Sequence, residues 1–132
     1  MISLTSPYTF FVPGVPRSSQ TGSVVRAGHR LIPLRRGTAW SATFGLLALQ
    51  HKPSRPLAGA VRVSMAFQFH RPASAKKRAR PTVRPDVENL CKGLLDSLNG
   101  VFWADDAQVT SLELHKVYAD PVGVSVMIWE IN

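Results

Sequence analysis

Residues 87 to 100 read VENLCKGLLDSLNG, and their apolar side chains recur at the spacing of an α-helix. Side chains at i, i+3, i+4, i+7, i+8 and i+11 form one continuous stripe. The stripe consists of Val87, Leu90, Cys91, Leu94, Leu95 and Leu98. The opposite side, at about 100° per residue, carries Glu88, Asn89, Lys92 and Asp96. Because Asn99-Gly100 is typical of a helix end, we predict an amphipathic helix that stops there.

Strands are predicted on both sides of this helix along the chain. Residues 61 to 70, VRVSMAFQFH, alternate with a period of two, which places one face of a strand on a core. Residues 7 to 12 predict a short strand that ends at Pro13, and residues 107 to 117 and 122 to 131 predict two more. The last strand is apolar on both faces, so we expect a central strand or a subunit contact.

A second helix and a loop complete the expected elements. Residues 38 to 51 carry apolar side chains at helical spacing, with Thr38 as the candidate N-cap and Pro53 just beyond the end. Residues 14 to 30 are rich in Gly, Ser and Arg and predict a flexible basic loop. We therefore expect an α+β fold, a compact single domain over residues 1 to 132 with a mixed β-sheet and two principal α-helices.

Composition excludes several classes of protein. No apolar run approaches the roughly 18 residues that a membrane-spanning helix requires, and the first residues do not read as a secretion signal. The single cysteine, Cys91, cannot form an intramolecular disulfide or a four-cysteine zinc site. The four histidines are scattered rather than set at metal-ligand spacing. A reducing compartment, the cytoplasm, fits best.

Charge is distributed very unevenly along the chain. Residues 1 to 85 contain no Asp or Glu but hold 14 of the 16 Lys and Arg, and all eight acids lie between Asp86 and Glu130. Such a basic stretch attracts polyanions, because each neutralised phosphate releases condensed counterions. Nucleic acid is therefore the expected partner, although a merely solubilising cationic surface is the simpler alternative.

The cations are densest in residues 71 to 85, RPASAKKRARPTVRP, which have three prolines and almost nothing apolar. We predict a mobile loop that binds DNA. Its candidate DNA-binding residues are Arg71, Lys76, Lys77, Arg78, Arg80 and Arg84.

Carboxylates follow this loop directly. Asp86 and Glu88 stand at the start of the predicted helix, Lys92 lies one turn beyond Glu88, and Asp105-Asp106 precede a later strand. Mg²⁺ prefers oxygen ligands and usually takes one or two carboxylates from the protein, while phosphate and water complete the shell. Carboxylates next to a basic loop therefore suggest metal-dependent phosphodiester hydrolysis, with Lys92 stabilising transition-state charge.

Each of these residues also has a purely structural interpretation. Asp86 is in position to cap the helix, and Glu88 with Lys92 is an ordinary i to i+4 pair worth about 0.3 to 0.5 kcal/mol. Asp105-Asp106 could be no more than a turn. Adjacent residues on a strand point to opposite faces, so only one of the two aspartates is expected to join the site.

The stretch RPDVENLCKGLLDSLNGVFWADDAQV, residues 84 to 109, resembles the signature of the RusA family of Holliday junction resolvases. That signature is an Asp-x-Asp-Asn-Leu-x-x-x-Lys-like helix start, followed by a tryptophan and an Asp-Asp pair. A looser similarity extends over the strand near 7 to 12, the helix near 38 to 51 and the strand near 59 to 70. A match of this length is specific.

The resemblance implies roles for individual residues. Asp86, Glu88 and Asp106 match the family's three metal-binding acids, Lys92 matches its catalytic lysine, and Asn89 and Gln108 fall on supporting positions. It also implies a RusA-like fold and a homodimer that nicks opposed strands of a four-way DNA junction with Mg²⁺ or Mn²⁺. Such proteins are commonly encoded by phages and prophages.

One departure from the pattern concerns the second acid, which is Glu88 where the family has Asp. The additional methylene moves the carboxylate by more than about 1 Å, a displacement that can cost about a hundredfold in rate. Three hypotheses follow: an active resolvase, a degenerate resolvase that binds junctions but cuts poorly, and a non-catalytic basic nucleic-acid-binding protein. A requirement for metal separates the first from the last.

Overall fold

Four strands form a mixed sheet in the computed structural model, which describes residues 5–18, 21–27, 30–35 and 38–131. In spatial order they are β1 (Tyr8–Pro13), β6 (Gly123–Ile131), β4 (Ala60–Phe69) and β5 (Val109–Tyr118). β6 runs antiparallel to both of its neighbours, and β4 and β5 are parallel. The predicted mixed sheet is confirmed, and β6 has the central position that its two apolar faces indicated.

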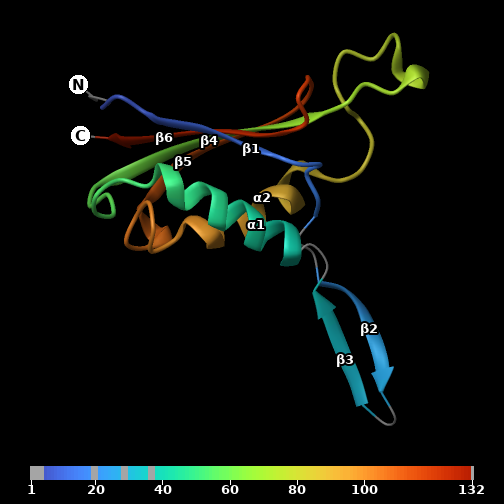
Figure 1. Ribbon diagram of the computed structural model, residues 1–132, viewed down its shortest axis with the longest axis horizontal. Coiled ribbons are helices and arrows are strands. Elements are labelled where there is room, and N and C mark those ends of the chain that lie inside the picture. Colours follow the sequence, from blue (N-terminus) through green and yellow to red (C-terminus); the bar gives the residue numbers. More distant parts are fainter. Residues whose placement is uncertain (1–4, 19–20, 28–29, 36–37, 132) are drawn as a thin grey trace.

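Two helices cover the same face of this sheet (Figure 1). They are α1 (Thr38–Ala48), continued by the 3₁₀ turn η1 (Leu49–His51), and α2 (Val87–Leu98). Phe44 of α1, Leu94 of α2 and Val63 of β4 have no exposed surface and belong to one hydrophobic core. The expected α+β single domain is therefore present, and the stripe predicted for α2 is the face that it buries.

Helix length bears on the question of membrane insertion. α2, with 12 residues, is the longer of the two α-helices, whereas a span needs about 20 apolar residues. Among the described residues, no helix has the length and apolar character that crossing a membrane would need.

The parallel pair β4 and β5 needs a long crossover between its strands. That crossover contains the basic loop, then α2, then the 3₁₀ turn η3 (Asp106–Gln108), which leads directly into β5. All of the predicted catalytic residues lie on this one connection. Packing of α2 against the sheet therefore sets where the start of the helix and the turn stand relative to each other.

Part of the loop predicted for residues 14 to 30 is instead a β-hairpin, whereas residues 14 to 18 have no regular secondary structure. β2 (Thr21–Ala27) pairs antiparallel with β3 (Arg30–Arg35) in a separate two-stranded sheet. The hairpin extends away from the main sheet and helices (Figure 1). Val24 and Val25 are β-branched, and such residues favour extended backbone. The parts of the predicted loop at residues 19, 20, 28 and 29 lie outside the described residues.

Candidate active site

Asp86 occupies the N-cap position of α2, with φ −71° and ψ 143°. Its backbone carbonyl accepts bonds from the N–H groups of Asn89 (3.1 Å) and Leu90 (3.2 Å), but its side chain makes no capping bond. The exposed carboxylate instead borders a cavity of about 430 Å³ that Arg84 and Asn89 also line. The structural interpretation of Asp86 as a side-chain cap is therefore wrong, and its carboxylate is available to a ligand.

Lys92 bonds to a different residue than the helical spacing suggested. Its ammonium donates to Asn89 Oδ1 at 3.3 Å, and among the described residues it forms no ion pair with Glu88. Asn89 is 9% exposed, and it is the one polar residue that is buried among the described residues. Asn89 thus holds Lys92 on the face of α2, and this leaves Glu88 exposed one turn away.

The two adjacent aspartates have different environments, and they lie at the turn η3 just before β5, ahead of the strand as the sequence suggested. Asp105 is the N-cap of η3 and forms a capping box with Gln108: its backbone carbonyl accepts the Gln108 N–H at 2.9 Å, and the Gln108 side-chain oxygen accepts the Asp105 N–H at 2.9 Å. Gln108 also donates to the carbonyls of Leu57 (2.7 Å) and Gly59 (2.9 Å), which ties the turn to the chain before β4. Capping therefore occupies Asp105.

Asp106 is oriented from the core. The indole N–H of Trp103, a residue with no exposed surface, donates to Asp106 Oδ1 at 2.9 Å. The exposed Asp106 side chain borders a second cavity of about 420 Å³, lined also by Lys92 and Asp96. Spacing left open which of Asp105 and Asp106 joins the site, and the geometry favours Asp106.

Two ionisable residues that line this cavity, Asp96 and Cys91, were not among the predicted site residues. Asp96 is exposed and lies one turn beyond Lys92, so helical spacing from Lys92 was the signal that could have identified it. Cys91 lies in the same wall, and burial raises the pKa of its thiol. A thiol kept protonated in this way is a poor metal ligand, because the thiolate is the form that binds metal.

The donor chemistry fits a hard divalent cation, but the described residues do not present a preassembled metal cage. No group of three or more His, Cys, Asp or Glu among them is placed to hold one ion. Asp86 and Asp106 border separate cavities, although both cavities are bounded by α2, at Asn89 and at Lys92. Since Mg²⁺ usually takes only one or two protein carboxylates, phosphate and water would have to complete the shell.

Lys116 is another residue that the sequence did not reveal. From β5 its ammonium donates to the carbonyls of Val83 (2.6 Å) and Pro85 (2.7 Å), immediately before Asp86. A lysine in a strand is unremarkable in sequence, and only the fold brings it to this backbone. Lys116 therefore joins the end of the basic loop to the sheet and sets the position of the α2 start.

The basic loop is folded back at its base by its own arginines. Arg71 donates to the carbonyls of Ala75 (3.0 Å) and Arg78, and its guanidinium carbon lies 4.4 Å from the ring centre of Tyr118. Ala75 ends a 3₁₀ turn, η2 (Ala73–Ala75), and is buried. Arg78 donates to the Tyr118 hydroxyl at 3.2 Å. Arg71 and Arg78 thus shape the loop. The sequence predicted them only as DNA contacts and did not reveal this structural role.

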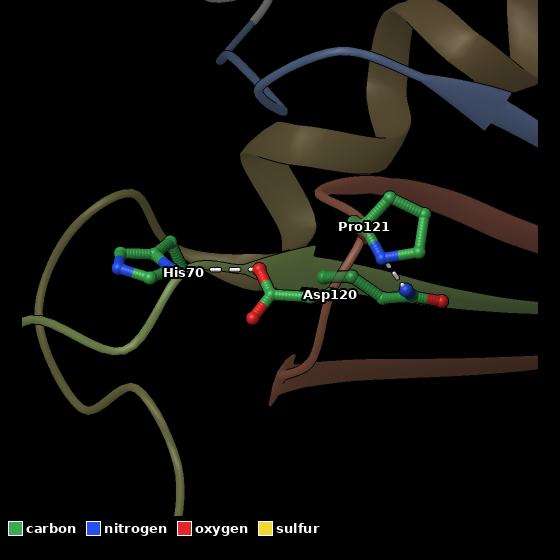
Figure 2. A network of polar contacts seen from close by, with 4 residues as sticks. His70, Asp120 and Pro121 are labelled. Atoms are coloured by element: carbon green, nitrogen blue, oxygen red, sulfur yellow. Dashed lines mark hydrogen bonds and ion pairs between the residues drawn. The ribbon is translucent and has the colours of Figure 1, made fainter.

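The remaining cations of the loop are exposed. They are Lys76, Lys77, Arg80 and Arg84, and none has a hydrogen bond or ion pair to another described residue. Where the loop leaves β4, His70 Nδ1 lies 3.4 Å from Asp120 Oδ1, in the turn between β5 and β6, as Figure 2 shows. The loop therefore leaves the sheet from an anchored start and presents exposed cations, of which Arg84 borders the same cavity as Asp86.

Comparison with known proteins gives a consistent result. The sequence matches the family described as "Endodeoxyribonuclease RusA" over residues 13–129, a segment that includes both cavities' α2 residues and the η3 turn. It is also 37% identical over 138 aligned positions to "Uncharacterized protein YqaN" of Bacillus subtilis (strain 168), covering 95% of this chain and 96% of that relative. The chain therefore belongs to the RusA family of endodeoxyribonucleases.

Proposed function

We propose that this protein resolves Holliday junctions by metal-dependent hydrolysis of phosphodiester bonds, in DNA recombination or repair. Membership of the RusA family supports a nuclease that acts on branched DNA. The observation that carries the proposal in this chain is the state of Asp86: an exposed carboxylate with no capping bond, in a cavity shared with Arg84 of the basic loop. If Asp86 only capped the helix, its carboxylate would accept hydrogen bonds from the first backbone N–H groups of α2.

The proposed roles follow the position of each side chain. Lys76, Lys77, Arg80 and Arg84 hold the phosphate backbone, and Arg71 and Arg78 act mainly by shaping their loop. Asp86, Glu88 and Asp106 provide the acidic oxygens of the site. Lys92, held by Asn89, places a positive charge on the cavity that Asp106 borders, where charge develops on the phosphoryl group.

Mg²⁺, or Mn²⁺ in its place, is the proposed cofactor, and resolvases of this family generally depend on a divalent metal. When bound, it would activate water and neutralise charge on the leaving oxygen. The acids and the basic loop act on the DNA in opposite ways, because carboxylates repel phosphate and cations attract it. Cations on Arg84 and the loop tip offset this repulsion and draw the backbone toward Asp86.

A homodimer is proposed as the working form, because opposed nicks in a junction need two sites at a fixed separation. The sequence offered either face of the last strand as the contact. Val124, Val126 and Ile128 are buried in the chain's own core, and this leaves the face with Met127 and Trp129, which the two helices do not cover (Figure 1).

The direct test is cleavage of a synthetic four-way junction with Mg²⁺, with Mn²⁺ and with EDTA, beside a linear duplex of equal length. We expect paired nicks in the junction with either metal and none with EDTA. Equal cutting of both DNAs would contradict junction selectivity. Binding with steep salt dependence but no cutting would favour the non-catalytic basic protein instead.

Lys116→Met is expected to lower the nicking rate by about ten- to a hundredfold, the effect typical of lost outer-shell support at a metal site. The reason is that the backbone before Asp86 loses both ammonium bonds. The measurements are the single-turnover rate and the Mg²⁺ concentration that gives half of it. Lys116→Arg is the control, since a guanidinium can donate to the same carbonyls and should restore part of the rate. Loss in both variants with unchanged metal dependence would indicate a general structural defect.

Glu88→Asp tests the degenerate-resolvase alternative, which the absence of a three-ligand group among the described residues keeps open. If the longer side chain misplaces its carboxylate, shortening it should raise the cleavage rate, by up to about a hundredfold. Glu88→Gln serves as the control, because it keeps the length and removes the charge. A slower Glu88→Asp enzyme would mean that the site is built for glutamate.

A further inference from the structure

A small hollow lies between the end of the sheet and the folded-back basic loop. Phe69 and Tyr118, which pair across the ends of β4 and β5, contribute to one side of it. Pro72, Pro81 and Val83 of the loop contribute to the other. The hollow measures about 160 Å³ and is lined mainly by apolar surface. This apolar surface contrasts with the many cations of the loop.

The contacts that fold the loop over the sheet also hold the hollow in shape. Arg71 stacks on Tyr118 and Arg78 bonds to its hydroxyl, so the loop is fixed over the strand ends. Lys116 holds the carbonyl of Val83, yet the Val83 side chain remains 54% exposed. Val83 therefore presents apolar surface to solvent beside the hollow.

Arg84 places this hollow beside the proposed catalytic carboxylate. Arg84 lines both the hollow and the larger cavity bordered by Asp86. A DNA strand with a phosphate in the Asp86 cavity would therefore have the base of a neighbouring nucleotide within reach of the hollow. The volume is well below the roughly 300 to 1,000 Å³ of pockets for drug-sized ligands, so it suits one flat ring system rather than a whole nucleotide.

We propose that this hollow receives one unstacked nucleobase, next to the phosphodiester held at Asp86. Apolar and aromatic walls take up the faces of the base, and the Arg84 guanidinium lies at the boundary with the phosphate. The inference rests on the proposed DNA substrate. It also gives a physical reason for selecting branched DNA, because extracting a base costs least where stacking and pairing are already interrupted.

The test is a binding experiment with junctions in which each nucleotide flanking the branch point is replaced in turn by an abasic site. Ca²⁺ replaces Mg²⁺ so that binding is measured without cutting. We expect one position at which the missing base weakens binding by roughly 5- to 100-fold, the range of base stacking on protein. Val83→Trp, which fills the hollow, should bind intact and abasic junctions equally.

Two further variants control for the substitution itself. Leu46→Trp changes another exposed apolar residue, on α1 and 68% exposed, and should show the same abasic penalty as the parent. Val83→Ala leaves the hollow open but shortens one of its walls, so it should lower the abasic penalty only in part. If every abasic junction binds as tightly as the intact one, or if the penalty persists in Val83→Trp, the hollow does not hold a base. A parent that shows the penalty but never cuts would support the base site and contradict the nuclease.

Discussion

Asp106→Asn is expected to reduce metal-dependent nicking of a four-way junction by more than about a hundredfold, since even outer-shell changes at metal sites cost about ten- to a hundredfold. The amide keeps the size of the side chain and an oxygen that can accept the Trp103 N–H, so the turn should survive. What it removes is the negative charge in the cavity that Lys92 shares. Asp86→Asn should have a similar effect, because it removes the uncapped carboxylate from the other cavity.

Asp105→Asn is the matched control for this experiment. Asparagine and aspartate are about equally good N-caps, so the η3 turn should persist and the rate should stay within about twofold of the parent. Gel-shift affinity for the junction should be close to the parent value in all three variants, since the loop cations are unchanged. If Asp105→Asn is inactive and Asp106→Asn cuts normally, the assignment of the two aspartates is reversed.

Trp103→Ala is expected to lower the free energy of unfolding by about 3 to 5 kcal/mol, the usual cost of truncating a large buried aromatic residue. Trp103 is fully buried among the core residues, and its carbonyl accepts the Gly100 N–H at 2.7 Å just after α2 ends. The substitution leaves a large cavity in the core and removes the indole bond to Asp106, whereas the main-chain bond to Gly100 can persist. Urea unfolding followed by circular dichroism measures the effect without relying on tryptophan emission.

Trp103→Phe separates packing from orientation of the site. It keeps much of the apolar volume and should recover most of the lost stability, but it cannot donate to Asp106. We therefore expect a folded protein with slower nicking. A Trp103→Phe enzyme with parental stability and parental rate would show that the indole bond to Asp106 has no role in the reaction.

Local sequence patterns were sufficient for most of the secondary structure. The α2 stripe, the alternation in β4 and the two-sided apolar character of β6 each follow from which faces the element must bury. The β2–β3 hairpin was missed because Gly, Ser and Arg suggested a loop, whereas Val24 and Val25 favour a strand once a partner strand is present. Pairing partners are not visible in a local pattern.

Residue roles in the site were less accessible. The signature around residues 84 to 109 identified the acids, but it could not show that Asp105 is a cap and Asp106 is not. That distinction depends on Trp103 and Gln108, whose partners come from the core and from the chain before β4. Likewise, helical spacing paired Lys92 with Glu88, and the observed partner is Asn89.

The sequence by itself determined the family, the order along the chain of the two helices and the four main-sheet strands, and the segregation of charge, because each depends on residue type and spacing. Only the tertiary structure decided that Lys116 holds the backbone before Asp86, that Arg71 folds the basic loop, and that Arg84 lies between two cavities. These contacts join residues that are brought together by the β4–β5 crossover and by packing of α2. Such proximity is a property of the folded chain, and no local pattern encodes it.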